Sequence, residues 1–181
     1  RSQDGLADIA TELGRTGAQA HTVLLDLAGK HAGEQAERAL AERGLVCDIL
    51  VNSAGFGVFG SATQADRQQQ LELLDVIIRA LTDLTLRFVP GMVARKHGRI
   101  LNVGSITGYV PGPHMAAYHA SKAYVRSFTA ALAVELKGTG VSATCLAPGI
   151  VVSPGCLSTG FNKKRLARLI PPSTAREVAT D

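Results

Sequence analysis

Short apolar stretches alternate with longer segments of helical periodicity along almost the whole chain. Strands are expected at residues 20–25, 46–51, 98–104 and 141–147, and helices at residues 4–14, 34–43, 66–96 and 114–137, with a last one opened by residues 174–177. Parallel strands need long crossover connections, and the intervening helices supply them. The alternation therefore predicts an α/β fold with a parallel sheet and right-handed crossovers. A break or kink is expected at Pro90, inside the longest helix.

Length and composition suit one domain of this kind. The chain has 181 residues, of which 46% are hydrophobic, and we expect residues 1–181 to form a single domain. We see no apolar run long enough for a membrane span and no leader at the start, so no membrane association is expected. Three cysteines, Cys47, Cys145 and Cys156, lack metal-like spacing, and an odd number fits a reducing cytoplasm. We expect a cytoplasmic protein without a bound metal.

A basic cluster near the carboxyl end contributes to the net charge of +4. It consists of Lys163, Lys164, Arg165 and Arg168, without interleaved aromatic residues. Such a cluster could face an acidic partner, but a solvated helix face is the better interpretation. No nucleic-acid partner is expected.

Tyr118 and Lys122 belong to the pentapeptide Tyr-His-Ala-Ser-Lys and lie four residues apart in a predicted helix. That spacing places both on one helix face. A tyrosine with its ordinary pKa of ~10 is a poor acid or base at neutral pH, and a nearby ammonium favours the phenolate. Taken alone, such a pair more often belongs to a solvated helix face. Its neighbours decide between the two interpretations.

Three further signals follow predicted strands. Ser105 ends the strand at residues 98–104, the run Asn52-Ser-Ala-Gly55 ends another, and Pro148-Gly149 follows a third. The carboxyl ends of parallel strands meet at one edge of a sheet, where ligands bind in open α/β folds. In order and spacing, these signals and the pentapeptide resemble those of the short-chain dehydrogenase/reductase family. The resemblance implies a Rossmann-like, doubly wound parallel sheet over the whole chain.

The resemblance also implies an activity, which is hydride transfer between NADP(H) or NAD(H) and a carbonyl/alcohol substrate. Tyr118 would exchange a proton with the substrate oxygen, Lys122 would lower the tyrosine pKa and bind the nicotinamide ribose, and Ser105 would hydrogen-bond the same oxygen. The other interpretation of Ser105 is a turn-forming serine. Family members commonly pair two helices across a two-fold axis, so a homodimer or homotetramer is expected.

Further cofactor contacts are implied at the strand ends. The cofactor-binding set is Asp26, Asn52, Ala54, Gly55, Tyr118, Lys122, Pro148, Gly149 and Val151. Ser153 stands where a threonine often contacts the carboxamide. Asp26 would meet the adenine amino group, although a helix N-cap is nearly as good an interpretation. Pro148 would otherwise be an ordinary strand-to-loop proline.

The chain departs from the family pattern at its amino end. The family opens with two strands and a glycine-rich loop, and nothing before Asp4 supplies them, so we expect an incomplete sheet that lacks both. Residues 55–60 match G-x-G-x-x-G, but no helix or acidic strand end follows at the required distance. Arg1 stands where NADP-preferring members often carry an arginine, which slightly favours NADP over NAD.

A second departure is Ile77, which stands where the family carries a catalytic asparagine that helps to hold a water beside the lysine. Isoleucine cannot hold it, so the substitution means either better packing or a weakened proton relay. The competing function is therefore a non-catalytic binding or scaffold protein with the same fold, or an inactive fragment. A nucleotide-sugar epimerase also uses such a serine, tyrosine and lysine, but Asn52-Ser-Ala-Gly55 and Pro148-Gly149 argue against it. The substrate itself is not readable from the sequence.

Overall fold

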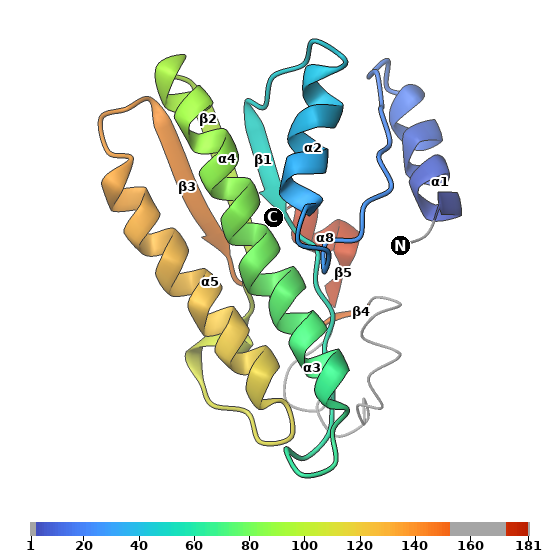
Figure 1. The fold of residues 1–181 in the computed structure, drawn as a ribbon, viewed down its shortest axis with the longest axis vertical. Helices are drawn as coiled ribbons and strands as arrows, with labels where there is room; N and C mark the ends of the chain where they lie inside the picture. The colour runs from blue at the N-terminus through green and yellow to red at the C-terminus, as the bar shows by residue number, and fades with distance from the viewer. Residues whose placement is uncertain (1–2, 153–172, 181) are drawn as a thin grey trace. The chain divides into compact units, whose positions relative to one another are not determined.

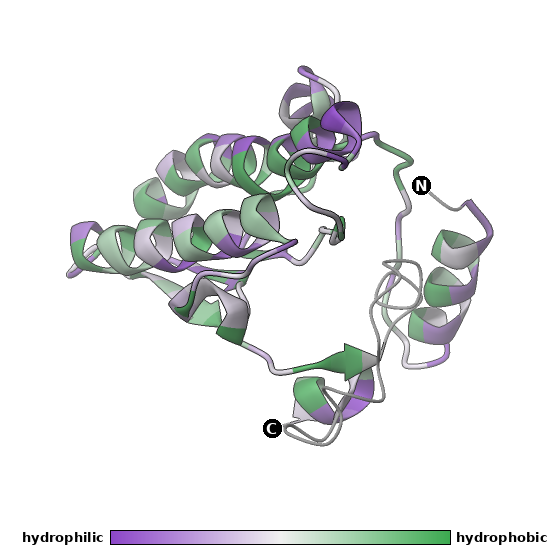
Figure 2. Ribbon diagram, turned by 90° about the horizontal axis from the view of Figure 1, so that it is seen from below, coloured by the Kyte–Doolittle hydropathy of each residue, from purple (hydrophilic) through white to green (hydrophobic). Residues whose placement is uncertain are grey.

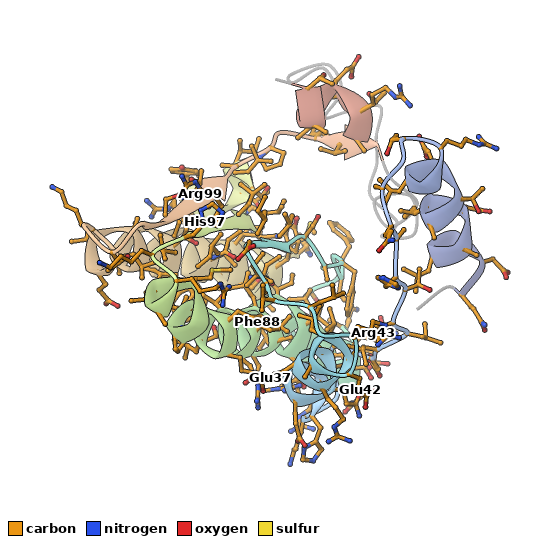
Figure 3. The ribbon with its side chains drawn as sticks, turned by 90° about the horizontal axis from the view of Figure 1, so that it is seen from above. Glu37, Glu42, Arg43, Phe88, His97 and Arg99 are labelled. Atoms are coloured by element: carbon orange, nitrogen blue, oxygen red, sulfur yellow. The ribbon has the colours of Figure 1, made fainter. Side chains whose placement is uncertain are left out.

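The computed structural model describes residues 3–152 and 173–180. The chain divides into two compact units, the first ending at Val46 and the second beginning at Cys47. The first unit carries two helices, α1 (Gln3–Gly14) and α2 (Ala32–Ala41). Both helices were predicted, and α1 shows hydrophobic and hydrophilic residues side by side (Figure 2). The turn after α2 depends on Gly44, whose φ of 63° favours glycine, and the Leu45 N–H donates to the Leu40 carbonyl at 3.0 Å. The charged side chains of Glu37, Glu42 and Arg43 lie on α2 and this turn (Figure 3).

The predicted strand at residues 20–25 does not form. This segment is extended without regular pairing, and within the described part of the chain no strand lies hydrogen-bonded beside it. A strand is stabilised by a neighbour that pairs its N–H and C=O groups, so an apolar sequence alone does not produce one.

A three-stranded parallel sheet organises the second unit. Its strands are β1 (Ile49–Asn52), β2 (Gly98–Val103) and β3 (Val141–Leu146), in the order β1-β2-β3. The register pairs Asn52 with Asn102 and Asn102 with Cys145, so the three carboxyl ends are level. Three of the four predicted strands form, with ends within one residue of those predicted, except that β1 begins at Ile49 rather than at residue 46.

Two long helical segments cross over between these strands and lie on one face of the sheet (Figure 1). The first runs through α3 (Arg67–Leu74), a π-helical segment η1 (Asp75–Ala80) and α4 (Leu81–Ala94). The second is α5 (Ala116–Glu135), preceded by the 3-10 turn η2 (Ile106–Tyr109). Strands linked by helices into a parallel sheet make this a Rossmann-like α/β fold.

A break or kink was predicted at Pro90, and the helix does not break there, because α4 continues through this residue to Ala94. Proline removes one helical hydrogen bond, but its exposed position requires no burial of the unpaired carbonyl. Residues on both sides of Pro90 pack into the core, which outweighs the local preference. They are Phe88, Val89, Met92 and Val93, of which Phe88 is labelled in Figure 3.

Two apolar clusters fill the space between the helices and the sheet. One gathers around Met92, Ile100 and Leu132 at the amino ends of the strands, and the other gathers around Leu73, Ile77, Leu81 and Val125. The second cluster also contacts Tyr118, which binds the helix that carries the predicted site to the core. The site therefore stands on a packed support.

A small element completes the second unit. Strands β4 (Val151–Val152) and β5 (Ser173–Thr174) pair in parallel, and helix α8 (Ala175–Thr180) follows directly. The predicted capping box is confirmed, because the Thr174 N–H donates to Glu177 at 2.6 Å and the Glu177 N–H donates to the Thr174 hydroxyl at 3.2 Å. The amide hydrogen bond holds the pKa of Glu177 below its usual value. Within residues 3–152 and 173–180, no helix combines the length and hydropathy needed to cross a membrane.

Candidate active site

A pocket of about 770 Å³ opens at the carboxyl ends of the strands. Its described lining comes from the carboxyl-terminal parts of β1, β2 and β3 and the segments after them, from the start of α5 and from α8: Val51, Ser53, Gly55, Phe56, Gly57, Leu101, Val103, Gly104, Ser105, Met115, Tyr118, Lys122, Leu146, Pro148, Gly149, Ile150, Val151, Ala175, Val178 and Ala179. The structure therefore brings Ser105, Tyr118 and Lys122 to one cavity, as the positions of their motifs predict. Sequence reasoning missed Phe56, Met115 and Val178, because a single apolar residue gives no chemical signal of a site.

Tyr118 and Lys122 lie one turn apart on α5, and the Lys122 ammonium nitrogen is 5.7 Å from the centre of the Tyr118 ring. Lys122 is only 5% exposed, and its Nζ donates to the Val103 carbonyl at 2.8 Å. Burial lowers the pKa of Lys122 to about 8. A buried cation beside a phenol favours the phenolate, so this pair has the geometry of an acid–base device.

Ser105 connects the end of β2 to η2. Its backbone is extended, and its Oγ accepts a hydrogen bond from the Thr107 N–H at 3.1 Å, so the serine does form the turn. The oxygen is the acceptor in this bond, which leaves the hydroxyl proton able to donate to a ligand. Turn formation and a hydrogen bond to a substrate are therefore compatible.

The loops around the pocket are tied together by backbone hydrogen bonds. The Gly104 N–H donates to the Leu146 carbonyl at 2.7 Å, and the Ile106 N–H donates to the Pro148 carbonyl at 3.0 Å. These bonds hold Ser105 beside the loop that contains Pro148 and Gly149. The predicted residues Pro148, Gly149 and Val151 all line the pocket, from one segment that follows β3.

Gly55 brings backbone close to Lys122. A Cβ at this position would lie 3.3 Å from the Ile77 side chain and 3.9 Å from the Lys122 Nζ. Glycine thus keeps the space above the ammonium open. Ala54, in the same loop, is exposed and is not among the described lining residues.

Asn52 is placed differently from the other predicted residues, because its side chain is buried below the pocket. The Asn52 Nδ2 donates to the Thr85 hydroxyl at 3.1 Å and to the Asn102 Oδ1 at 2.9 Å, and the Asn102 Nδ2 donates to the Thr129 hydroxyl at 2.9 Å. This network joins β1, β2, α4 and α5. Sequence reasoning missed Asn102, Thr85 and Thr129; a polar residue in the middle of an apolar strand, as at Asn102, is the signal that could have found them.

Ile77 lies in the π-helical segment, is 2% exposed, and packs against Leu73, Leu81 and Val125. Its side chain faces Gly55, on the side of the loop that also approaches Lys122. The wall beside the lysine is therefore apolar here. The packing interpretation of Ile77 is satisfied by these contacts.

Residues 55–60 do not begin a helix. The next α-helix starts at Arg67, where the Asp66 carboxylate accepts hydrogen bonds from the N–H groups of Gln68 and Gln69. A phosphate cradle requires its glycines directly before a helix N-terminus. This geometry agrees with the interpretation of residues 55–60 as a loop.

Other predicted positions belong to the first unit or fall outside the described residues. Asp26 belongs to residues 1–46, where its Oδ1 accepts from the Ala28 N–H at 3.1 Å in a turn. Arg1, Ser153, Cys156 and the basic cluster at residues 163–168 fall outside the described residues. Among the described residues, no group of three or more histidine, cysteine or acidic side chains could hold a metal ion.

The family model for short chain dehydrogenases matches residues 1–164. This chain belongs to the short-chain dehydrogenase family. The NADP-dependent 3-hydroxy acid dehydrogenase of Escherichia coli (strain K12) is 34% identical over 152 residues, which are 83% of this chain and 60% of that protein. A probable NADP-dependent dehydrogenase of Haemophilus influenzae is 32% identical over 166 residues, 91% of this chain and 63% of that protein. The chain thus spans about three fifths of the length of these relatives.

Solved structures of the short-chain dehydrogenase family share the fold. A putative NAD(P) dependent gluconate 5-dehydrogenase from Beutenbergia cavernae, with bound NADP at low occupancy, superposes with a TM-score of 0.81 at 34% identity, covering 92% of this chain and 66% of that one. A short-chain dehydrogenase from Sphingobium yanoikuyae in complex with NADPH has a TM-score of 0.88 at 24% identity, covering 99% of this chain and 69% of that one. The second likeness concerns the fold alone.

Proposed function

We propose that the protein is an oxidoreductase that transfers hydride between NADP(H), or NAD(H), and a carbonyl/alcohol substrate. The observation that carries the proposal is the meeting of Ser105, Tyr118 and Lys122 in one pocket at the carboxyl edge of a parallel sheet. NADP is favoured, because the relatives named above are described as NADP-dependent or were solved with NADP.

Three side chains have separate roles in the reaction at the substrate oxygen. Tyr118 gives a proton to the carbonyl oxygen during reduction and removes it from the alcohol in the reverse direction. Lys122, buried and charged, stabilises the phenolate form of Tyr118. Ser105 donates its hydroxyl proton to the same oxygen, where negative charge develops.

The described residues fit the nicotinamide end of the cofactor. Lys122 has three N–H donors and gives one to Val103, so others can meet the ribose, and Gly55 leaves the space beside them open. Pro148, Gly149 and Val151 line the same pocket, as do Ser53 and Gly55, the sequence neighbours of Ala54. A nicotinamide bound beside these residues would supply or accept the hydride. In residues 3–152 and 173–180, no α-helix begins at a glycine-rich turn after a strand, so no pyrophosphate cradle is assigned.

We also propose that the whole protein is a cytoplasmic homodimer or homotetramer. The support is exposed apolar area on the long helices, for example Leu71 at 40%, Leu86 at 57% and Val134 at 72%. Sedimentation at micromolar concentration tests this assembly, and a clean monomer would count against it.

The test of the proposed function uses the full-length gene product with NADPH and a panel of aldehydes and ketones. An enzyme consumes NADPH only when a carbonyl is present, and the alcohol product appears in equal amount. The competing interpretation, a non-catalytic binding protein, predicts a complex with NADPH and no consumption with any member of the panel. That result would reject the proposed function.

A further inference from the structure

The 3-10 turn η2 carries Ser105 at its amino end and lies against helix α5. Building on the proposed function, we infer that Gly108 and His119 are positioning residues that dock η2 on α5. The docking aims the Ser105 hydroxyl at the oxygen that Tyr118 protonates. Neither Gly108 nor His119 is among the described lining residues of the pocket, so both act through Ser105.

Gly108 brings the backbone of η2 against the backbone of α5. A Cβ at this position would lie 2.7 Å from the Lys122 carbonyl oxygen and 3.1 Å from the Ala123 nitrogen. A real Cβ does not tolerate a neighbour at the shorter distance, and both neighbours are main-chain atoms that cannot rotate away. The φ of Gly108 is not positive, so the space beside α5, rather than the backbone conformation, requires glycine here.

Hydrogen bonds connect Gly108 to the Ser105 side chain. The Gly108 N–H donates to the Ser105 carbonyl at 3.0 Å, and the Thr107 N–H donates to the Ser105 Oγ at 3.1 Å. The Ile106 N–H is tethered to the Pro148 carbonyl at 3.0 Å, so a shift at Gly108 tilts the turn about this bond. Tilting the turn changes the direction in which the Ser105 hydroxyl points.

His119 fixes the carboxyl end of the same turn. Its Nδ1 lies 2.8 Å from the carbonyl oxygen of Val110, the residue that ends η2. A carbonyl oxygen only accepts, so this nitrogen carries the proton. Because His119 follows Tyr118 in α5, the bond ties η2 to the turn of the helix that carries the proposed acid.

Of the two contacting elements, η2 is the one that moves when the contact is disturbed. Helix α5 has 20 residues, and Ser121, Lys122 and Val125 are buried at this level of the helix. The turn η2 has four residues, of which Ile106 and Tyr109 are exposed. A methyl group added to η2 at the contact therefore displaces the serine and leaves the tyrosine–lysine pair in place.

A double-mutant cycle tests this route on the full-length protein with NADPH and a carbonyl substrate. We expect Gly108→Ala to lower kcat by about tenfold, because a donor displaced by about 1 Å loses much of its effect, and to change the Kd of NADPH by less than about twofold. In the Ser105→Ala background, the same substitution should lower kcat by less than about twofold, since the misplaced hydroxyl is already absent. Similar losses in both backgrounds, or no loss in either, would overturn the inference.

Gly98→Ala is the matched control for a tight glycine. A Cβ at this position would lie 2.7 Å from the Met92 side chain, in the core at the opposite end of β2 from Ser105. We expect Gly98→Ala to lower the free energy of unfolding and to leave kcat per folded molecule unchanged. A loss of kcat equal to that of Gly108→Ala would assign the effect to general destabilisation and overturn the inference.

His119 gives a second measurement, which decides if Gly108→Ala does not fold. His119→Ala removes the donor to Val110, whereas His119→Asn keeps an N–H at a similar place in the side chain. We expect His119→Ala to lower kcat by about threefold or more only while Ser105 is present, and His119→Asn to stay within about twofold of the wild type. Equal kcat in His119→Ala and the wild type would overturn the inference and leave the proposed function intact. A wild-type protein that consumes NADPH with no carbonyl of the panel would reject both.

Discussion

Lys122 is a buried cation, and its burial makes the free energy of unfolding depend on pH. Its pKa is lowered to about 8 in the folded protein, whereas an unfolded lysine keeps its ordinary pKa of 10.5. Between these two values the unfolded state binds more protons, so stability rises with pH. Below pH 8 the folded state carries the full cost of the buried charge.

The variant Lys122→Met removes this cost while keeping the length of the side chain. We expect it to be more stable than the wild type at pH 7, and the difference to shrink by about 1–3 kcal/mol as the pH rises from 8 to 10.5. Denaturant unfolding of both proteins without cofactor, at several pH values, measures the difference. A difference in stability that stays constant over this range would show that burial does not lower the pKa of Lys122.

Substitutions of Ile77 test whether the apolar wall beside Lys122 affects only stability or also turnover. It is 2% exposed in the cluster with Leu73 and Val125, so we expect Ile77→Asn to destabilise the fold by about 2–4 kcal/mol. We also expect it to raise turnover per folded molecule, because an amide can hold a water beside the lysine. Ile77→Val, which stays apolar, should cost about 1 kcal/mol and leave turnover unchanged. No gain in turnover with Ile77→Asn would mean that another group completes the relay.

Much of the site was readable at this scale, because its chemistry depends on local spacing. The interval between Tyr118 and Lys122 places both on one helix face, and Ser105 follows the end of β2 at the ligand-binding edge. The contacts of Asn52 were not readable, because its partners Thr85 and Asn102 are distant in sequence. Long-range side-chain pairing requires the register of the strands, which no local pattern gives.

The buried polar network is what fixes the strands to the helices near the site. It joins Asn52 on β1, Asn102 on β2, Thr85 on α4 and Thr129 on α5. Thr129 continues it by donating to the Val125 carbonyl, at 2.6 Å. Each member satisfies a group that would otherwise be buried without a partner.

Removing the central member should therefore affect several elements together. We expect Asn102→Ala to lower the free energy of unfolding by about 2–3 kcal/mol, because Asn52 and Thr129 lose a partner. Ser142→Ala, at an exposed position of β3, should change it by less than about 0.5 kcal/mol. In a double-mutant cycle, Asn52→Ala and Asn102→Ala should be coupled by about 1 kcal/mol or more. Strict additivity would contradict the network.

Elements supported by their own pattern were predicted well, and those that depend on a neighbour were not. The crossover helices and strands β2 and β3 follow from periodicity, and the capping box of α8 follows from four residues. The segment at residues 20–25 has a strand-like sequence and remains unpaired in the described part of the chain. Pro90 shows the opposite case, in which packing overrides an unfavourable local residue.

The sheet of the second unit leaves apolar area in water. Strand β1 is at one edge of the three-stranded sheet, and its residues Ile49 and Val51 are 67% and 53% exposed. An unpaired edge with exposed apolar side chains favours association between chains.

We therefore expect the 181 residues, expressed alone, to unfold over a broad, weakly cooperative transition and to bind no NADP(H) at millimolar concentration. The broad transition is expected because apolar side chains of β1 remain in water. The lack of binding is expected because no pyrophosphate cradle is assigned in the described residues. Thermal scans with and without NADPH measure both effects. A sharp transition that shifts upward with cofactor would show that the sheet is completed in another way, for example by strand exchange.

The role of Tyr118 is the claim on which the whole account depends. Tyr118→Phe keeps the ring packed on the core and removes only the hydroxyl. Tyr109→Phe removes the same group from an exposed ring, whose centre lies 4.7 Å from the Arg126 Cζ. The measurement is kcat for reduction of a carbonyl substrate by the full-length protein at saturating NADPH. We expect Tyr118→Phe to lower kcat by at least ~10², with cofactor binding retained, and Tyr109→Phe to leave it unchanged. Wild-type turnover in Tyr118→Phe would contradict the account.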